Sequence, residues 1–456
     1  MIDAKQIPDD VLAVCRRLRQ AGFEAYLVGG SVRDLLVGRS VGDFDVATSA
    51  RPADTLRVFG ARFSVPTGIQ HGTVTVLAGE PPRLRQVEVT TFRGEGAYLD
   101  GRHPSVVTFG ATLAEDLSRR DFTMNAIAYE PEAGAIIDLH QGQQDIARRL
   151  VRTVGDPIQR FSEDGLRPMR AVRQATQLGF EVDAFTLAAI PATMEAFRKV
   201  SAERVRDELL KLLLAPHPSR GIELMRQTGL LAEVLPEVLA TFGCRQNRFH
   251  KHDVYQHSLA TLDAVSAEPI LRLAALLHDV GKPRTQTAQP EAPGEFGFFK
   301  HEYVGAEMVE AIAGRLRMSR AETELLVGLV ANHMFFYTPD WTDGTVRRFV
   351  NRAQAERIAL LFALREADIV SRGRGEDREC ETRELRARIA RVAAEDAALR
   401  VKDLAVNGAD VMRVLGVGPG PQVGRILNRL LERVLDDPAL NQKEILERLI
   451  PELASG

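Results

Sequence analysis

Two aspartates separated by one residue are the first chemical signal in the sequence. Asp43 and Asp45 flank Phe44, and alternate residues of a β-strand point to one face, so both carboxylates would converge while Phe44 faces the core. Converging carboxylates are what a pair of Mg²⁺ ions needs to activate an attacking hydroxyl and hold a triphosphate. Because an isolated D-x-D is more often a turn or a solvated strand, the pair needs support from its surroundings.

That support comes from the preceding segment. The apolar strand predicted at 25–28 ends in Gly29 and Gly30, where missing side chains let backbone N–H groups approach a phosphate chain at a helix N-terminus. Arg33 lies one turn into that helix and could reach the same phosphates. Glu88, the polar residue of an alternating strand, could supply a third carboxylate, or it could equally be a solvated strand residue.

Two further polar clusters could hold the sugar and the base of a nucleotide. Arg120, Asp121 and Asn125 supply a cation, an acceptor and an amide, which suits a ribose and its 2′-hydroxyl, although such a triplet can also be an exposed salt-bridged turn. Asp164 and Arg167 have helical i, i+3 spacing, which would place an acceptor and a forked donor on one face. That pair could match a cytosine or adenine edge, or it could form a simple ion pair.

Arg170 and Arg173 continue this predicted face and would reach phosphates. Residues 148–211 hold 12 Lys or Arg against 9 Asp or Glu, a net charge of +3 in a chain of net charge −3. The chain has 51 arginines and 8 lysines, and arginine suits bidentate phosphate contacts. Codon bias in a GC-rich genome explains the same excess, so arginine abundance alone decides nothing.

In order along the chain, these motifs resemble the class II tRNA nucleotidyltransferase and bacterial poly(A) polymerase family, within the DNA polymerase β-like superfamily. GGSVRD…DFD resembles the family's catalytic motif, 119–126 (RRDFTMNA) its ribose-recognition motif, and 163–167 (EDGLR) its EDxxR motif, in which Asp and Arg read the incoming base. The resemblance implies template-independent addition of the 3′-terminal CCA, or of its last A, to tRNA from CTP and ATP.

The motifs and this resemblance together predict a catalytic and nucleotide-binding site. We expect catalysis and Mg²⁺ binding at Asp43 and Asp45, with Glu88 as a further catalytic carboxylate. The predicted nucleotide-binding residues are Gly29, Gly30, Arg33, Arg119, Arg120, Asp121, Asn125, Asp164, Arg167, Arg170 and Arg173.

The Gly/Pro-rich segment Thr91–Phe109 is predicted to be a mobile loop that carries Arg93, Glu95, Asp100 and Arg102. In the family, a flexible element here accompanies the switch to adding the terminal A, which argues against an enzyme restricted to CC. Full CCA addition, A-only addition and poly(A) synthesis remain alternatives.

Histidines are concentrated in the second half of the chain. The order His257, then His278 and Asp279 after an apolar helix, then Asp368 resembles the signature of HD phosphohydrolases. The resemblance implies that these side chains meet on one divalent ion, either a transition metal or Mg²⁺.

Further residues could extend this metal site. His301 and His333 could hold a second metal, and Lys282 could bind a phosphate. The site could be an active phosphodiesterase or phosphatase on terminal phosphates, or the fold could be purely structural. A metal phosphohydrolase whose N-terminal part only positions RNA is therefore the rival function from another class; a non-catalytic RNA-binding protein is a third.

The elements that must position these residues change character near residue 147. Before it, we predict a helix at 11–21, strands at 25–28, 44–47, 72–77 and 86–90, and a short helix at 32–36. After it, helical periodicity dominates, with helices predicted at 166–178, 202–214, 221–228, 259–265, 271–277, 306–315, 321–332, 353–367, 381–394 and 425–435.

The predicted fold is therefore α+β and multidomain. A polymerase β-like nucleotidyltransferase head (1–147) precedes an all-α neck (148–215) that selects the base and binds RNA. A helical body (216–400) contains the HD domain, at about 250–372, and a helical tail (401–456) follows. Gly416–Gly424 could form an anion nest for an RNA backbone or simply cap the next helix.

Composition sets the wider limits. The chain has 456 residues, 45% of them hydrophobic and 27% charged, which is typical of globular proteins. No apolar run approaches the roughly 20 residues of a membrane span, and the acidic start lacks the order of a signal peptide. Three widely spaced cysteines (Cys15, Cys244 and Cys380) favour a reducing cytoplasm. We expect tRNA, ATP and CTP as partners, no DNA and no membrane; no oligomeric state is predicted.

Overall fold

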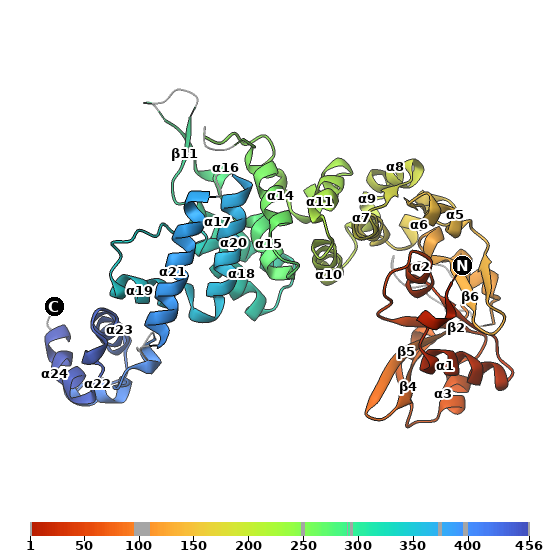
Figure 1. Ribbon diagram of the computed structural model, residues 1–456, viewed down its shortest axis with the longest axis horizontal. Helices are drawn as coiled ribbons and strands as arrows, with labels where there is room; N and C mark the ends of the chain where they lie inside the picture. The colour runs from red at the N-terminus through yellow and green to blue at the C-terminus, as the bar shows by residue number, and fades with distance from the viewer. Residues whose placement is uncertain are drawn as a thin grey trace. The chain divides into compact units, whose positions relative to one another are not determined.

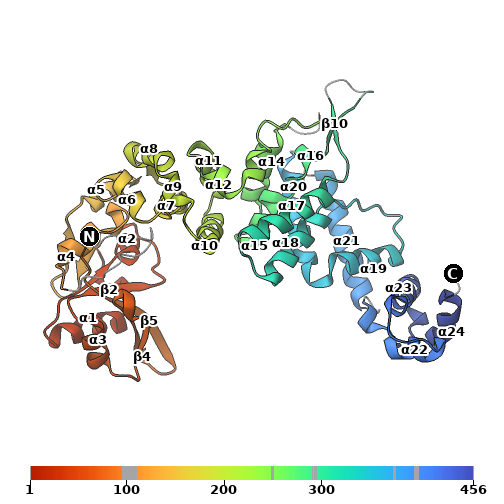
Figure 2. The ribbon, with the colours of Figure 1, turned by 180° about the vertical axis from the view of Figure 1, so that it is seen from behind.

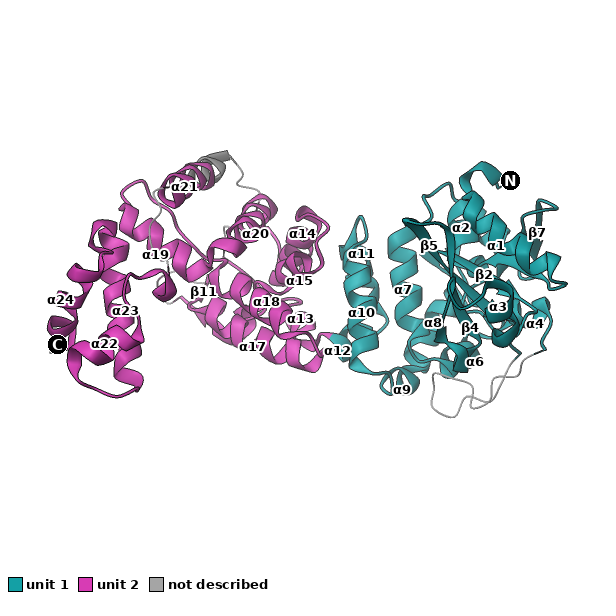
Figure 3. Ribbon diagram, turned by 90° about the horizontal axis from the view of Figure 1, so that it is seen from below, with its two compact units in different colours: residues 1–234 teal, residues 235–456 magenta. Residues whose placement is uncertain are grey.

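The computed structural model describes residues 2–94, 110–247, 251–289, 291, 295–372, 376–394 and 400–454. The chain divides into two compact units, Met1–Val234 and Leu235–Gly456 (Figure 3). The loop predicted at 91–109 falls mainly on 95–109, outside the described residues. None of the described helices combines the length and the apolar character that crossing a membrane requires.

The first unit is built on a mixed seven-stranded sheet in the order β3-β4-β5-β2-β1-β6-β7. Its strands are β1 Ala25–Val28, β2 Phe44–Thr48, β3 Ser64–Gly68, β4 Thr73–Glu80, β5 Arg83–Thr91, β6 Ile127–Glu130 and β7 Ala135–Asp138. The β2–β5 pair is parallel, whereas its other neighbouring strands pair antiparallel. The four predicted strands are confirmed, and β3, β6 and β7 complete the sheet.

The two faces of this sheet have different neighbours. Helices α1 (Asp9–Gln20) and α3 (Pro52–Phe59) cover one face (Figure 1). On this face Leu18 and Phe59 join Leu27, Phe44 and Val87 in a buried core. Because side chains alternate along a strand, Asp45 and Glu88 belong to the opposite face. A smaller apolar cluster on that face includes Val28, Phe92 and Leu117 of α4 (Leu113–Ser118).

Helices complete the first unit. They are α2 Gly30–Leu36, α5 Gly142–Ala147, α6 Pro157–Glu163, α7 Arg167–Leu178, α8 Ala184–Ala192, α9 Met194–Phe197, α10 Ala202–Leu213, α11 Pro218–Gln227 and α12 Leu230–Val234, with the 3₁₀ turn η3 Thr123–Asn125 and the short strands β8 Leu150–Val151 and β9 Glu181–Val182. The predicted helices at 166–178, 202–214 and 221–228 are confirmed. Helix α8 was not predicted, because it is apolar on all sides and contains Pro191.

The second unit is almost entirely helical. Its elements are α13 Pro236–Leu239, α14 Val254–Ala264, α15 Pro269–Leu277, α16 Lys282–Thr285, β10 Gln286–Ala288, β11 Phe296–Phe298, α17 His301–Arg315, α18 Arg320–Asn332, α19 Asp343–Ala353, α20 Ile358–Ser371, α21 Glu376–Ala394, α22 Gly408–Leu415, α23 Pro421–Asp436 and α24 Lys443–Ala454. Helices α14, α15, α17, α18 and α20 form one bundle (Figures 1 and 2). The last three helices share a separate apolar cluster that includes Val411, Leu430 and Leu446.

One helix predicted in this unit is wrong as a single element. The periodic run 353–367 is divided, because α19 ends at Ala353 and α20 begins only at Ile358. Gln354 between them has φ +64°, a left-handed conformation that a continuous helix cannot contain. The α+β architecture, with a mixed sheet followed by helices, is nevertheless as predicted.

Candidate active site and metal centre

The edge between β1, β2 and β5 brings two of the predicted carboxylates together. In the strand pairing Asp45 lies opposite Glu88 of β5 and opposite Val28 of β1. Gly29 follows Val28 directly and has φ +75°; a Cβ there would lie 3.4 Å from Asp45 Oδ2 and 3.1 Å from Arg120 Nη1. The turn after β1 therefore passes close to the carboxylate, where a side chain would be crowded by Arg120 and strained by the positive φ.

The pKa of Asp45 reflects the negative charges that lie close to it. Burial, the nearby Glu88 carboxylate and Asp43 raise the pKa of Asp45 to about 6, against an opposing effect of Arg120. Carboxylates that disfavour each other's ionised form are stabilised by a divalent cation, and oxygen donors are the ligands that Mg²⁺ prefers. Asp43 and Glu88 are exposed, so the group is open to solvent. The donor set therefore fits a divalent cation.

The first helix after this turn carries Arg33, which faces several partners. Its Nη1 donates to Asn125 Oδ1 at 2.8 Å and to Gln174 Oε1 at 3.1 Å, while Nε and Nη2 donate to Asp34. A Cβ at Gly30 would lie 3.4 Å from Arg33 Nη2. The guanidinium thus packs against the glycine turn and also reaches the neck.

The two neighbouring arginines 119 and 120 are held by one buried carboxylate. Asp116, 1% exposed, pairs with Arg119 at 3.0 Å and with Arg120 at 3.1 Å. We did not single out Asp116 from the sequence, although its i, i+3 and i, i+4 spacing to the arginines was a usable signal. It aims Arg120 toward the Asp45 side of the site.

Asp121 and Asn125 belong to a second hydrogen-bonded group. Asn125 Nδ2 donates to Asp121 Oδ1 at 3.0 Å, and Arg170 pairs with Asp121 Oδ2 at 2.8 Å. Although burial opposes ionisation, the Arg170 charge and the Asn125 hydrogen bond hold the pKa of Asp121 well below its ordinary value. Asp121 is therefore a fixed anion that ties η3 to α7.

The expectation that Asp164 and Arg167 share one helical face is wrong. Helix α6 ends at Glu163 and α7 begins at Arg167, so Asp164 stands in the break with extended backbone angles. The break coincides with Gly165, where a Cβ would lie 2.1 Å from Ala196 O and prevent the packing of α9.

The two side chains consequently have different partners. Asp164 accepts from Arg204 Nη2 at 2.9 Å, whereas Arg167 pairs with Glu163 at 2.6 Å. Arg167 also donates to the backbone oxygens of Arg160 and Arg119, so it joins the neck to the predicted ribose motif.

Several residues around α7 were missed by sequence reasoning. Glu208 of α10 pairs with Arg173 at 2.5 Å and lies 3.7 Å from Arg170. Arg204 and Glu208 belong to α10, which follows α7 in the sequence only after α8 and α9, and they pair with Asp164 and Arg173. Gln174 resembles any other glutamine of an amphipathic helix. No local signal in the sequence separates these residues from solvated neighbours.

In the second unit, six side chains form two groups of metal-ligand type. His257, His278 and Asp368 form one group and Asp279, His301 and His333 the other, and within each group one ligand atom per residue lies within 4.8 Å of the others. The groups touch through Asp279: Oδ2 is 3.1 Å from His278 Nε2, and Oδ1 is 3.2 Å from His301 Nε2. Each of the six residues lies on one of five helices, α14, α15, α17, α18 and α20, or within two residues after its end.

The imidazole rings are oriented as metal ligands require. Nδ1 of His278, His301 and His333 lies 2.8, 2.8 and 2.7 Å from the backbone oxygens of Ala275, Phe298 and Val330, three residues earlier in each case, which leaves Nε2 to point inward.

Three buried atoms in the centre, Asp279 Oδ1, His301 Nε2 and His333 Nε2, make no well-aligned hydrogen bond, although both ring nitrogens lie within 3.7 Å of Asp279 Oδ1. Burial lowers the pKa of His333 to about 4, so this ring is neutral and can donate a lone pair. The donor set fits one or two divalent cations.

Cations of the protein surround the same cluster. Lys282 Nζ lies 2.6 Å from Asp279 Oδ2, and Arg372 Nη2 lies 2.7 Å from Asp368 Oδ2. Arg365 pairs with Asp368 at 3.0 Å. Arg365 and Arg372 were not singled out from the sequence, and their i−3 and i+4 spacing to Asp368 was the signal that could have found them.

Family models match most of the chain. The poly A polymerase head domain matches residues 25–152, and a model described as "Probable RNA and SrmB- binding site of polymerase A" matches 179–241. The HD domain matches 254–393. These matches, together with the sheet and its carboxylates, place the chain in one class of protein: a polymerase-type nucleotidyltransferase with an HD domain.

Relatives of similar length narrow this class. The CCA-adding enzyme of Levilactobacillus brevis is 36% identical over 95% of both chains, and that of Streptococcus gordonii is 33% identical over 97% of both. The crystal structure of the Bacillus stearothermophilus CCA-adding enzyme in complex with CTP has 30% identity and a TM-score of 0.71, covering 97% of this chain and 96% of that one. The chain belongs to the CCA-adding enzyme family, whose members are tRNA nucleotidyltransferases.

Proposed function

We propose that this chain adds the 3′-terminal CCA to tRNA, using CTP and ATP without a nucleic-acid template. The observation that carries the proposal is the position of Asp45, beside the Gly29 turn and opposite Glu88. This arrangement places carboxylates next to backbone N–H groups that can receive a triphosphate. The oxygen of the tRNA 3′-hydroxyl attacks the α-phosphorus of the nucleotide and loses its proton to solvent as the new phosphodiester bond forms. The bond from the α-phosphorus to the oxygen that bridges the α- and β-phosphates breaks, and pyrophosphate leaves.

In this proposal each part of the site has its own task. Asp43 and Asp45 hold Mg²⁺, with Glu88 beside them, and the bound ions supply charge neutralisation and an activated hydroxyl. Gly29, Gly30 and Arg33 receive the triphosphate. Arg119, Arg120, Asp121 and Asn125 orient the ribose, Asp164 and Arg167 select the base, and Arg170 and Arg173 support the phosphates and the neck.

The domain boundaries belong to the same proposal. We assign catalysis to the head (1–147), base selection and RNA binding to the neck (148–215), and tRNA binding to the body (216–400) and the tail (401–456). The net charge of +3 over residues 148–211 supports RNA contact at the neck. We place the reaction in the cytoplasm, where tRNA and both nucleotides are available.

The test uses three tRNA transcripts that end at the discriminator base, after CC and after CCA. Each is incubated with CTP, ATP, both or neither and resolved at single-nucleotide resolution. Addition of three nucleotides to the shortest transcript is expected. A single A added only to the CC end would assign A-only addition, and long A tails would assign poly(A) synthesis. Asp43→Ala and Asp45→Ala should abolish incorporation while tRNA binding persists.

A second function is supported by the HD cluster. We infer a metal-dependent phosphodiesterase or phosphatase that acts on terminal RNA phosphates, with a transition metal or Mg²⁺ held by His257, His278, Asp279 and Asp368. The inward-facing ligand atoms, which make no well-aligned hydrogen bond, and the adjacent Lys282 support this inference. Opening of a 2′,3′-cyclic phosphate end to a monophosphate by water, or release of phosphate from that monophosphate, should require metal and disappear in His278→Ala; retention of the activity in that variant would contradict it.

A further inference from the structure

A buried glutamine connects the residues assigned to the triphosphate and to the sugar. Gln174 of α7 is 3% exposed, and its Oε1 accepts hydrogen bonds from Arg33 Nη1 at 3.1 Å and from Asn125 Nδ2 at 3.0 Å. Arg33 belongs to α2 and Asn125 to η3. A single side-chain oxygen therefore joins three elements that are far apart in the sequence.

The hydrogen bonds leave the Asn125 amide only one orientation. Its Oδ1 accepts from Arg33 Nη1 at 2.8 Å, and its Nδ2 donates to Gln174 Oε1 and to Asp121 Oδ1, each at 3.0 Å. A primary amide has two donor hydrogens, and both are used here. Turning the amide over would set its NH₂ against the Arg33 donor and its oxygen against two acceptors.

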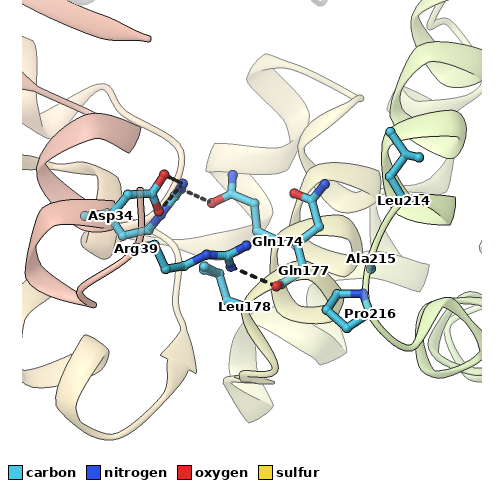
Figure 4. Close-up of a pocket in the computed structure, with 9 residues that line it drawn as sticks. Asp34, Arg39, Gln174, Gln177, Leu178, Leu214, Ala215 and Pro216 are labelled. Carbon is cyan, nitrogen blue, oxygen red and sulfur yellow. Dashed lines mark hydrogen bonds and ion pairs between the residues drawn. The ribbon is translucent and has the colours of Figure 1, made fainter. Parts of the chain in front are cut away.

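Gln174 stands at the wall of a small polar cavity. The cavity has a volume of about 170 Å³ and is also lined by Arg33, Arg39 and Gln177 (Figure 4). Gln177 lies one turn further along α7, where its Oε1 accepts from Arg173 and its Nε2 donates to Lys211 O. Gln177 thus shares the helix and the cavity with Gln174, but it has no hydrogen bond to Arg33 or Asn125.

We propose that Gln174 is a positioning residue for sugar discrimination: by fixing the Asn125 amide and the Arg33 guanidinium, it makes the site prefer ribonucleotides over deoxyribonucleotides. The inference rests on the proposed function, in which Asn125 meets the ribose. Both Asn125 donors are occupied, so the contact with the 2′-hydroxyl falls to the second lone pair of Asn125 Oδ1, which accepts from the hydroxyl. An amide free to turn over loses that contact for CTP and loses nothing for dCTP. A purely structural role would instead lower the rates with both nucleotides together.

The experiment measures kcat/KM for CTP and for dCTP on a tRNA ending at the discriminator base. Gln174→Met keeps the length and shape of the side chain but removes the acceptor, and should lower the CTP/dCTP ratio about fivefold to tenfold, the equivalent of one hydrogen bond. Gln174→Glu keeps an acceptor for both bonds and should retain the ratio. Gln177→Met is the matched control and should also retain it.

Each outcome separates this inference from the proposed function. A wild-type protein that adds no CTP would contradict the proposed function itself. Normal CTP addition with an unchanged ratio in Gln174→Met, or an equal loss in Gln177→Met, would overturn only the role of Gln174. If thermal melting shows that Gln174→Met does not fold, Gln174→Glu decides alone, because a lost ratio in that variant contradicts the proposal.

Discussion

Asp45 and Glu88 lie directly opposite each other in the parallel pair formed by β2 and β5. The pairing sets two carboxylates side by side on the sheet face away from α1 and α3, next to the glycine turn after β1. Burial and the charges of Glu88 and Asp43 raise the pKa of Asp45 to about 6. The site therefore carries an electrostatic cost in the absence of a cation, and this cost can be measured.

The first prediction concerns that cost. In the unfolded chain the pKa of Asp45 is near 3.8 and in the folded protein about 6, so the ionised carboxylate disfavours folding above pH 6, by on the order of 3 kcal/mol. Below pH 4 the group is mostly neutral in both states and the cost fades. Asp45→Asn should therefore stabilise the metal-free protein at pH 8 but not at pH 3.5, as measured by thermal unfolding in EDTA.

The same variant should have lost nucleotide incorporation, because an amide is a poor ligand for Mg²⁺. A variant that is both more stable and inactive identifies a carboxylate kept for chemistry at the expense of stability. Equal unfolding midpoints for Asp45→Asn and wild type at pH 8 would show that the charges at this site do not oppose one another.

The second prediction decides the role of Glu88, which from the sequence could be either a third carboxylate or a solvated strand residue. If Glu88 contributes to metal binding, Glu88→Gln should raise the Mg²⁺ concentration needed for half-maximal incorporation, by about threefold or more. Glu80→Gln, at the far end of the β4–β5 hairpin, is the control. An unchanged Mg²⁺ dependence in Glu88→Gln would show that Glu88 is a solvated strand residue with no role in metal binding.

The sequence predicts those parts of the site that rest on local patterns. Alternation and bounding glycines located β1, β2, β4 and β5, and apolar periodicity located most of the helices that carry the HD residues. The facing of Asp45 and Glu88 depends on strand register between distant segments, which no local pattern encodes. The prediction that Asp164 and Arg167 share one helical face was wrong because Gly165 packs on the backbone of Ala196, a contact made only in the folded chain.

The third prediction concerns the glycine turn. Gly29→Ala places a methyl group 3.1 Å from Arg120 Nη1 and forces a side chain into φ +75°. We expect loss of most incorporation activity and a destabilisation of about 1–3 kcal/mol from the backbone strain. Gly38→Ala is the matched control, since Gly38 has φ +71° with open space around it. If both variants lose stability and only Gly29→Ala loses activity, the contact accounts for the difference; equal activities would argue against a role for this turn.

The fourth prediction concerns base selection. Arg167→Lys keeps the charge but loses the planar fork of donors. We expect more misincorporation of UTP and ATP at the first position, with a smaller effect on the rate of CTP addition. Arg148→Lys, on an exposed stretch before the neck helices, controls for an exchange of arginine for lysine that does not involve the base. Unchanged nucleotide choice in Arg167→Lys would count against this side chain as a reader of the base.

The last prediction concerns the metal content of the HD cluster. Because Asp279 Oδ2 lies 3.1 Å from His278 and Oδ1 lies 3.2 Å from His301, one aspartate serves both ligand groups. After loading with Mn²⁺ in the presence of excess Mg²⁺ and gel filtration, we expect two bound Mn²⁺ ions per chain by elemental analysis. His301→Gln should retain one ion, whereas Asp279→Asn should weaken both. His252→Gln, on an exposed histidine near α14, should retain two. Loss of both ions in His301→Gln, with CCA addition intact, would mean that the six residues form one indivisible site.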